Sequence, residues 1–224
     1  EAFYSSQVLA RIISRAAVEA GAPEGSIQFI ETTERKAVKA LMQADQYLDV
    51  LIPRGGAGLI RLVLANATVP VIETGVGNCH IYVDAESDLE MAKTIIINAK
   101  TQRPGVCNAL ETLLVHEKIA AEFLPSLIEA LKARKVVLRG CERTCSLIAT
   151  GIEAATKDDW TAEYLDLVLA VRIVDNYEAA VEHINIYGTK HSEAIITRNY
   201  QTARDFLAQV DAAAVYVNAS TRFT

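Results

Sequence analysis

The chain has 224 residues, of which 51% are hydrophobic and 22% are charged, and its formal net charge is −6. This composition can build a sizeable core and excludes a disordered chain. The acidic balance, without any run of basic residues, disfavours nucleic acid and membranes as partners. No apolar stretch approaches the roughly 20 residues that a bilayer span needs, and the N-terminus lacks a secretory pattern. We therefore expect a globular, cytoplasmic α/β protein.

The first part of the chain alternates helix and strand patterns. Apolar residues at helical spacing predict helices over residues 8–20, 35–42 and 59–66. Gly21 stands where a glycine commonly ends a helix. Short apolar runs predict strands over residues 27–30, 50–52 and 69–72. Repeated strand–helix units of this length imply a parallel sheet.

The glycine-rich run at residues 73–78 predicts a domain boundary, which divides the chain into residues 1–75 and 76–224. Ser87 and Glu90 form a capping-box pattern that predicts the start of a helix running to Lys100. Further helices are predicted over residues 119–132, 175–187 and 199–209. Strands are predicted over residues 80–83, 112–115, 135–138, 165–174, 194–197 and 214–217. The second part therefore also alternates, apart from a loop with short pieces at residues 140–159.

Cys107 is the strongest candidate for a reactive residue. It follows the Pro104–Gly105 turn, and the cations Lys100 and Arg103 precede it within seven residues. Cationic neighbours favour the thiolate, which is the nucleophilic form of cysteine. A buried structural cysteine is the commoner fate of a free thiol, so the local pattern leaves both interpretations open.

Two further groups of residues are candidates on local grounds. Gly55 and Gly56 follow a predicted strand and precede a predicted helix, an arrangement that binds phosphate groups or simply makes a tight turn. Glu73 follows an apolar strand, where a carboxylate can act as a general base or stay solvated. Glu163, after Trp160, is either a ligand contact or a surface residue.

The histidines and the remaining cysteines do not predict a metal site. Neither His116 nor His183 has the spacing of metal ligands, and both are expected at the surface or at strand ends. His191 lies in a predicted loop and is a candidate for substrate contact. Cys141 and Cys145 lack nearby partners for a zinc site, so all four cysteines are expected to be reduced and no metal is expected.

Five runs of the sequence are distinctive and extend over essentially the whole chain: Leu51–Gly56, Val69–His80, Asn98–Asn108, Glu163–Asp166 and Val217–Thr224. In this order they resemble γ-glutamyl phosphate reductases, a family within the aldehyde dehydrogenase superfamily. The resemblance implies an aldehyde dehydrogenase-like α/β fold, with part of a parallel-sheet cofactor domain and an α/β catalytic domain that carries Cys107.

The resemblance also implies a reaction. NADPH would reduce L-glutamyl 5-phosphate to L-glutamate 5-semialdehyde and phosphate in proline biosynthesis, with Cys107 as the nucleophile that forms a thioacyl intermediate. The implied partners are the small-molecule substrate, glutamate 5-kinase and further copies of the same chain.

The same resemblance assigns roles to the other candidates. Glu73 aligns with the glutamate that activates water in hydrolytic members of the superfamily, although reduction of an acyl phosphate needs no such water. Glu163 matches the glutamate that contacts the nicotinamide ribose, and Gly55 and Gly56 fall near the cofactor. For Arg103, His191 and Arg222, the expected role is contact with phosphate or carboxylate groups.

Two alternatives remain open at this point: another oxidoreductase of the superfamily, and a fragment that keeps the fold without catalysis. Family members run on at both ends, and an oxyanion-stabilising side chain usually comes from the part that precedes this sequence. We therefore expect weak or no activity from these residues alone, and exposed apolar edges.

Overall fold

The computed structural model describes residues 2–72, 75–148 and 150–224. Glu73, one of the predicted site residues, lies outside the described residues. The chain forms two compact units, Glu1–Thr74 and Gly75–Thr224.

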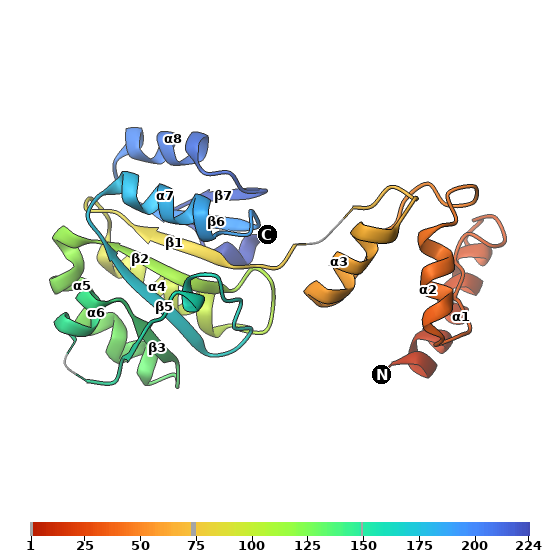
Figure 1. Cartoon of the computed structure of the whole chain (residues 1–224), viewed down its shortest axis with the longest axis horizontal. Coiled ribbons are helices and arrows are strands. Elements are labelled where there is room, and N and C mark those ends of the chain that lie inside the picture. The colour runs from red at the N-terminus through yellow and green to blue at the C-terminus, as the bar shows by residue number, and fades with distance from the viewer. Residues whose placement is uncertain (1, 73–74, 149) are drawn as a thin grey trace. The chain divides into compact units, whose positions relative to one another are not determined.

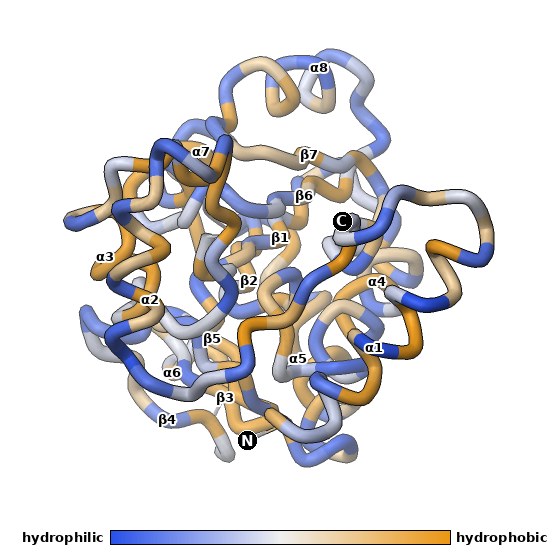
Figure 2. The backbone as a smooth tube through the Cα atoms, turned by 90° about the vertical axis from the view of Figure 1, so that its right-hand side faces the viewer, coloured by the Kyte–Doolittle hydropathy of each residue, from blue (hydrophilic) through white to orange (hydrophobic). Residues whose placement is uncertain are grey.

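The first unit contains three helices, α1 (Phe3–Glu19), α2 (Arg35–Met42) and α3 (Ala57–Asn66). The α1 helix ends at the predicted glycine, because Gly21 adopts a φ of 97° and donates its N–H to the Val18 carbonyl at 2.9 Å. Figure 2 colours much of α3 as hydrophobic. Large apolar side chains of α1 are exposed, among them Val8, Leu9, Ile12 and Ile13.

The strands predicted for the first unit are only partly present. Within residues 2–72, Leu51 and Val71 form a single parallel bridge, in which the Leu51 N–H donates to the Pro70 carbonyl at 2.8 Å. Parallel pairing of residues 50–52 with 69–72 is therefore confirmed over one bridge. The strand predicted at residues 27–30 is wrong: its backbone pairs with no other described segment, and apolar residues alone do not make a strand without such a partner.

The second unit is built on a seven-stranded sheet with the order β4-β3-β5-β2-β1-β6-β7, in which every neighbouring pair is parallel (Figure 1). The strands are β1 (Cys79–Val83), β2 (Leu110–His116), β3 (Val137–Gly140), β4 (Glu153–Ala154), β5 (Val168–Val174), β6 (Ser192–Ile196) and β7 (Ala214–Val217). All residues of β1, β2 and β6 are buried, including the polar ones, as expected for parallel strands that are covered on both faces.

Helices cover both faces of this sheet: α4 (Leu89–Thr101), α5 (Glu117–Lys132), α6 (Glu142–Leu147), α7 (Tyr177–Tyr187) and α8 (Tyr200–Gln209), with the short 3-10 turns η1 (Asp158–Trp160) and η2 (Thr221–Phe223). Ile81 and Leu113 pack with α4 and α5, whereas Tyr82 and Leu114 pack with α7 and α8 on the opposite face (Figure 1). Successive strand residues point to opposite faces, so the unit is a three-layer α/β structure with two hydrophobic cores.

Some predicted boundaries are corrected by local chemistry. The α4 helix is capped by Asp88 rather than Ser87: the Asp88 side chain accepts a hydrogen bond from the Met91 N–H at 3.1 Å. The fifth strand begins at Val168 rather than residue 165, since Leu165 adopts a left-handed φ of 54° that ends an extended segment. Pro125 lies inside α5, which continues through it.

Candidate active site

The turn that carries Cys107 lies between the end of α4 and the start of β2, at the edge of the sheet where the strands begin. Because all the strands are parallel, the segments that precede β1, β5 and β6 reach this same edge. Those segments contain Gly77, Glu163 and His191. The topology therefore gathers three separate parts of the sequence around one turn.

The backbone of Gly77 lies against the backbone of Cys107. A Cβ atom added to Gly77 would stand 1.4 Å from the Cys107 carbonyl oxygen, so only glycine fits this position. The same carbonyl accepts a hydrogen bond from the Cys79 thiol at 3.2 Å. The Cys107 thiol is free and its residue is half-buried. The nucleophile candidate is thus held by its main chain while its side chain keeps access to solvent.

Glu163 joins this group through Gly77. Its Oε1 atom accepts the Gly77 N–H at 2.7 Å across 86 positions of sequence. The glutamate is half-buried, so the structure favours a contact at the site over a solvated surface residue. The Glu163 carboxylate is therefore connected to the Cys107 turn through a single intervening residue, Gly77.

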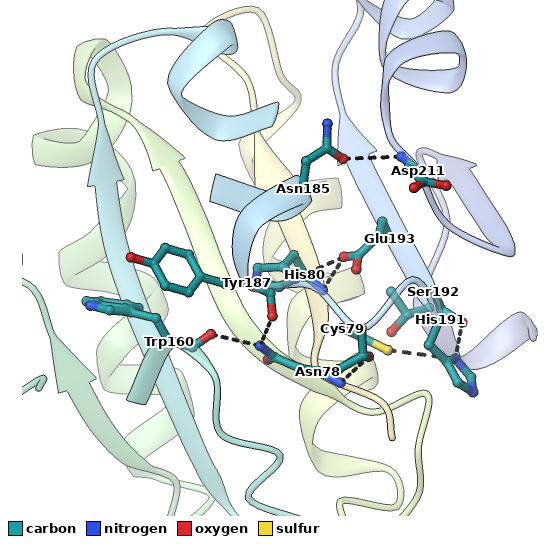
Figure 3. A network of polar contacts seen from close by, with 12 residues as sticks. Asn78, Cys79, His80, Trp160, Asn185, Tyr187, His191, Ser192, Glu193 and Asp211 are labelled. Carbon is teal, nitrogen blue, oxygen red and sulfur yellow. Dashed lines mark hydrogen bonds and ion pairs between the residues drawn. The ribbon is translucent and has the colours of Figure 1, made fainter. Parts of the chain in front are cut away.

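His191 immediately precedes β6 and lies beside Cys79. Its Nδ1 atom is 2.7 Å from the Ser192 Oγ and 4.0 Å from the Cys79 Sγ (Figure 3). Burial lowers the pKa of His191 below its ordinary value, and the charge of Glu163 opposes this shift only in part. The imidazole is therefore neutral near pH 7 and serves as a hydrogen-bonding group rather than as a cation.

The arginine candidates occupy two different settings. Arg222, in η2, donates its Nε–H to the Gln102 Oε1 at 3.0 Å, which brings it to the loop that leads into Cys107. Asn108 holds the same segment, because its Nδ2 donates to the Thr224 carbonyl at 3.0 Å. Arg103 is exposed, and its side chain has no hydrogen bond or ion pair within the described part of the chain. Both guanidinium groups are thus available near the turn for an anion.

Lys100 does not contribute a free charge to the thiol, in contrast to the prediction. Its side chain is fully buried, and its ammonium group lies 2.7 Å from the Glu111 Oε2. Burial lowers the pKa of Lys100 and raises the pKa of Glu111 to about 7, although their mutual attraction opposes both shifts. The prediction fails because the C-terminal turn of α4 directs the Lys100 side chain into the core rather than toward the loop that carries Cys107.

A second buried polar cluster lies behind the site on the α7 side of the sheet (Figure 3). The His80 Nδ1 atom is 3.1 Å from the Glu193 Oε2, and both side chains are buried. Asn78 donates its Nδ2 hydrogens to the carbonyls of Trp160 and Tyr187, at 2.8 and 2.9 Å. Asn78 thereby ties the entry to β1 to two other segments.

His183 belongs to this buried cluster within α7, and the expectation that it lies at the surface or at a strand end is wrong. It packs against the rings of His80, Trp160 and Tyr187, and the Arg172 Nη1 atom lies 2.9 Å from its Nδ1. Burial, together with the charges of His80 and Arg172, lowers the pKa of His183 to about 2. The helical periodicity of α7 turns this position toward the sheet, which the isolated residue type does not reveal. His116, by contrast, is at a strand end as predicted, where it caps α5.

Gly55 and Gly56 lie in the first unit, immediately before α3, and Gly56 is the N-cap residue of that helix. The predicted order there is strand, turn and helix. In the structure the strand is reduced to a single β-bridge, and the turn and the helix follow it. A cleft of about 620 Å³ opens in the same unit between α2 and α3. Its walls are apolar apart from two cations and one amide, and they comprise Arg35, Val38, Lys39, Met42, Gly58, Leu59, Leu62 and Asn66.

Among the described residues, no group of three or more His, Cys, Asp or Glu side chains could hold a metal ion. Cys141 and Cys145 are free, and the Cys145 thiol donates to the Gly140 carbonyl at 3.3 Å. No helix in residues 2–72, 75–148 and 150–224 is long and apolar enough to cross a membrane.

Sequence reasoning missed the residues that organise the turn. Gly77 stood out only as part of a glycine-rich run, and nothing local showed that its close contact would be Cys107, thirty positions later. The buried pairs Lys100–Glu111 and His80–Glu193 carried one signal, namely a charged residue inside an otherwise apolar stretch.

Comparison with known proteins confirms the resemblance noted in the sequence. The chain is 73% identical to γ-glutamyl phosphate reductase of Moorella thermoacetica and 63% identical to that of Halothermothrix orenii, over its full length in both cases. It spans about half the length of these curated relatives, 53% of each.

Solved structures agree with this result. The crystal structure of γ-glutamyl phosphate reductase from Thermotoga maritima matches with a TM-score of 0.94 and 54% identity, covering 100% of this chain and 54% of that one. An acetylating aldehyde dehydrogenase from Geobacillus thermoglucosidasius matches at 24% identity with a TM-score of 0.73, covering 96% and 55% of the two chains, which shows the common fold.

The model of the aldehyde dehydrogenase family matches residues 4–145. This match includes both the first unit and the turn around Cys107. With the parallel α/β sheet and its cysteine-bearing turn, the match shows that the chain belongs to the aldehyde dehydrogenase family.

Proposed function

We propose that this chain forms part of an NADPH-dependent reductase that converts L-glutamyl 5-phosphate to L-glutamate 5-semialdehyde and phosphate in proline biosynthesis. The observation that carries the proposal is the convergence of Cys107, Gly77 and Glu163 at one edge of the sheet, in a chain that resembles γ-glutamyl phosphate reductases over its full length. The three residues lie in or beside the runs that carry the resemblance.

Cys107 is the proposed nucleophile. Its thiolate attacks the acyl carbon of the substrate, a C–S bond forms, and the bond between carbon and the phosphate oxygen breaks. The electron pair leaves with phosphate, so a thioester remains on the protein. Arg103 and Arg222 lie near the turn and are the proposed contacts for the phosphate and carboxylate groups, since guanidinium groups bind both in a bidentate manner. His191, neutral at the start of β6, is proposed to donate or accept a hydrogen bond to the substrate.

When bound, NADPH would supply the hydride that reduces the thioester carbon on Cys107. The hemithioacetal that results collapses with loss of the Cys107 thiolate, and the aldehyde is released. Glu163 is the proposed contact for the nicotinamide ribose, and its bond to the Gly77 N–H keeps the carboxylate beside the nucleophile turn. Glu73 belongs to the proposed site by resemblance alone. Transfer of an acyl group from phosphate to a thiol consumes no water, so no proton-abstracting role is derived for Glu73.

The residues of the first unit fit a dinucleotide. The cleft between α2 and α3 has apolar walls that suit a flat base, and Arg35 and Lys39 bring positive charge to it. Such charge complements the extra phosphate that distinguishes NADPH from NADH. Gly55 and Gly56 precede the N-terminus of α3, where backbone N–H groups point outward and favour an anionic group.

The function is tested by following NADPH oxidation in a protein that carries this sequence over the length of its relatives. Glutamyl phosphate is expected to be reduced, whereas simple aldehydes are expected to be poor substrates in the reverse direction. Cys107→Ala should abolish turnover, because no other described thiol lies on the same turn. Cys141→Ala, which changes a half-buried thiol at the N-cap of α6, is the matched control and should retain activity. Normal turnover in the Cys107→Ala variant would rule out the proposed chemistry.

Three further features belong to the same proposal. Free cysteines fit a reducing compartment, and we propose the cytoplasm. The substrate is an acyl phosphate, so a kinase must supply it, and glutamate 5-kinase is the proposed source. We also propose that the protein assembles with copies of itself, which light scattering of the full-length protein would measure.

A further inference from the structure

The buried pair Lys100–Glu111 makes more contacts than charge neutralisation requires. Lys100 lies in the last turn of α4, Glu111 lies in β2, and neither side chain is exposed. One carboxylate oxygen of Glu111 accepts the Lys100 ammonium at 2.7 Å. The other oxygen accepts the backbone N–H of Leu165 at 3.3 Å, from a segment 54 positions away.

Stability alone gives little reason for such a pair. Removing two charges from water costs several kcal/mol, and apolar residues of similar size often replace a buried ion pair without loss of stability. A buried pair is therefore more readily explained by what it positions. In this case the positioned group is the main-chain N–H of Leu165. Leu165 lies in the segment that leads from Glu163 to the start of β5.

Leu165 is held in an unfavourable backbone conformation. Its φ is 54°, in the left-handed region that residues with a branched or bulky side chain seldom adopt. The Leu165 side chain is 47% exposed, so packing of that side chain does not explain the conformation. Strained residues persist where the surroundings fix them, and the bond to Glu111 is one such constraint.

The constraint reaches the nucleophile in two steps. Glu163 lies two residues before Leu165, and its carboxylate accepts the Gly77 N–H at 2.7 Å. Gly77 in turn lies against the Cys107 carbonyl, with no space for even a Cβ atom between them. A shift of the segment around Leu165 is therefore transmitted to Glu163 and to the main chain around Cys107.

We infer that Glu111 is a positioning residue: its carboxylate, whose charge Lys100 neutralises, accepts the Leu165 N–H, fixes the turn at Leu165 and so holds the Glu163 carboxylate against the Cys107 turn through Gly77. The catalytic part of this inference rests on the proposed function. The positioning part rests only on the contacts and is measured without substrate.

The test compares two double variants in the full-length protein, K100M/E111Q and K100M/E111L. Both remove the two charges and conserve volume, but only glutamine keeps an oxygen that accepts the Leu165 N–H. Hydrogen exchange of the Leu165 and Gly77 amides, followed without ligand, reports the turn directly. The KM for NADPH and kcat are measured in parallel, and V115A, at the other end of β2, controls for a general loss of stability.

K100M/E111L is expected to lose protection at both amides and to show a KM for NADPH raised about tenfold, because Glu163 is no longer fixed. K100M/E111Q and V115A should retain protection and a KM close to that of the unsubstituted protein. Equal protection in the two double variants would overturn the inference. If the wild-type protein shows no reductase activity, the proposed function fails while the exchange comparison still decides the positioning role.

A further variant covers the case in which K100M/E111L does not fold. Glu111→Asp keeps the charge beside Lys100 but shortens the side chain by one methylene, which removes its reach to Leu165. Loss of protection at Leu165 with an unchanged melting temperature supports the inference. Full protection at Leu165 in this variant would contradict it.

Discussion

The His183 imidazole is buried on the inner side of α7, and its surroundings make the folded chain sensitive to acid. Burial and the nearby His80 and Arg172 lower its pKa from 6.5 to about 2 in the folded state. An unfolded chain binds a proton at this position below the ordinary pKa, whereas the folded chain does not. The unfolded state therefore gains protons first, and stability is lost as the pH falls below about 6.5.

His183→Asn is expected to reduce this loss, because an asparagine oxygen can still accept from Arg172 and does not titrate. Between about pH 7 and about pH 5, the free energy of unfolding should fall by about 2 kcal/mol more in the unsubstituted protein than in the variant. Urea unfolding at both pH values measures the difference. A variant that loses as much stability on acidification as the unsubstituted protein would show that His183 is not the group responsible.

At the scale of elements, the start of α4 offers a direct comparison of two neighbouring residues. Asp88 caps the helix by accepting the Met91 N–H, whereas the buried Ser87 hydroxyl has no hydrogen-bond partner among the described residues. Asp88→Ala should therefore cost about 1 kcal/mol of unfolding free energy. Asp88→Asn keeps the acceptor and should cost little, and Ser87→Ala should be nearly neutral; denaturant unfolding measures all three. A larger loss of unfolding free energy in Ser87→Ala than in Asp88→Ala would show instead that Ser87 caps the helix, as the sequence suggested.

The elements of the second unit were largely predictable, because helical spacing and continuous apolar runs are local properties. The ranges of α7 and α8 differ little from those expected, and β7 is unchanged. Residues 27–30 failed because a strand requires a partner, and a partner is not a property of the segment itself. For Lys100 and His183, the pattern showed the helix but not which side of it faced the core.

The candidate site was predictable in part for the same reason. Cys107 and Glu163 emerged from runs that resemble a known family, and the structure brings their segments together through Gly77. The role of Gly77 is a contact between distant backbones. Neither residue type nor spacing reveals such a contact before the strand order β5-β2-β1 is known.

At the scale of the whole molecule, the two units are expected to contribute separable properties. The cleft between α2 and α3, which Arg35 and Lys39 line, belongs to the first unit, and the Cys107 turn belongs to the second. Lys39→Glu should raise the KM for NADPH about tenfold, because it places a negative charge where the cofactor phosphate is proposed to bind. Labelling of Cys107 by iodoacetamide, read by mass spectrometry, should proceed at an unchanged rate in that variant.

Lys36→Glu is the matched control, since Lys36 is exposed on the same helix but does not line the cleft. Conversely, Cys107→Ala should still bind NADPH, as measured by fluorescence. An equal effect of the Lys36 and Lys39 substitutions on the KM for NADPH would show that the cleft is not part of the cofactor site.

The placement of the Cys107 turn at the edge where the strands begin has a consequence for the electric field around the site. Helices α4 and α7 end close to this edge, at Thr101 and Tyr187, so each presents the partial negative charge of its last carbonyl groups there. The anionic substrate proposed for this site would approach against the dipoles of these two helices. Recognition of the anion would then depend on guanidinium side chains, which single substitutions can alter. Preference for a charged over a neutral acyl donor is thus a property that evolution can change without rebuilding the backbone.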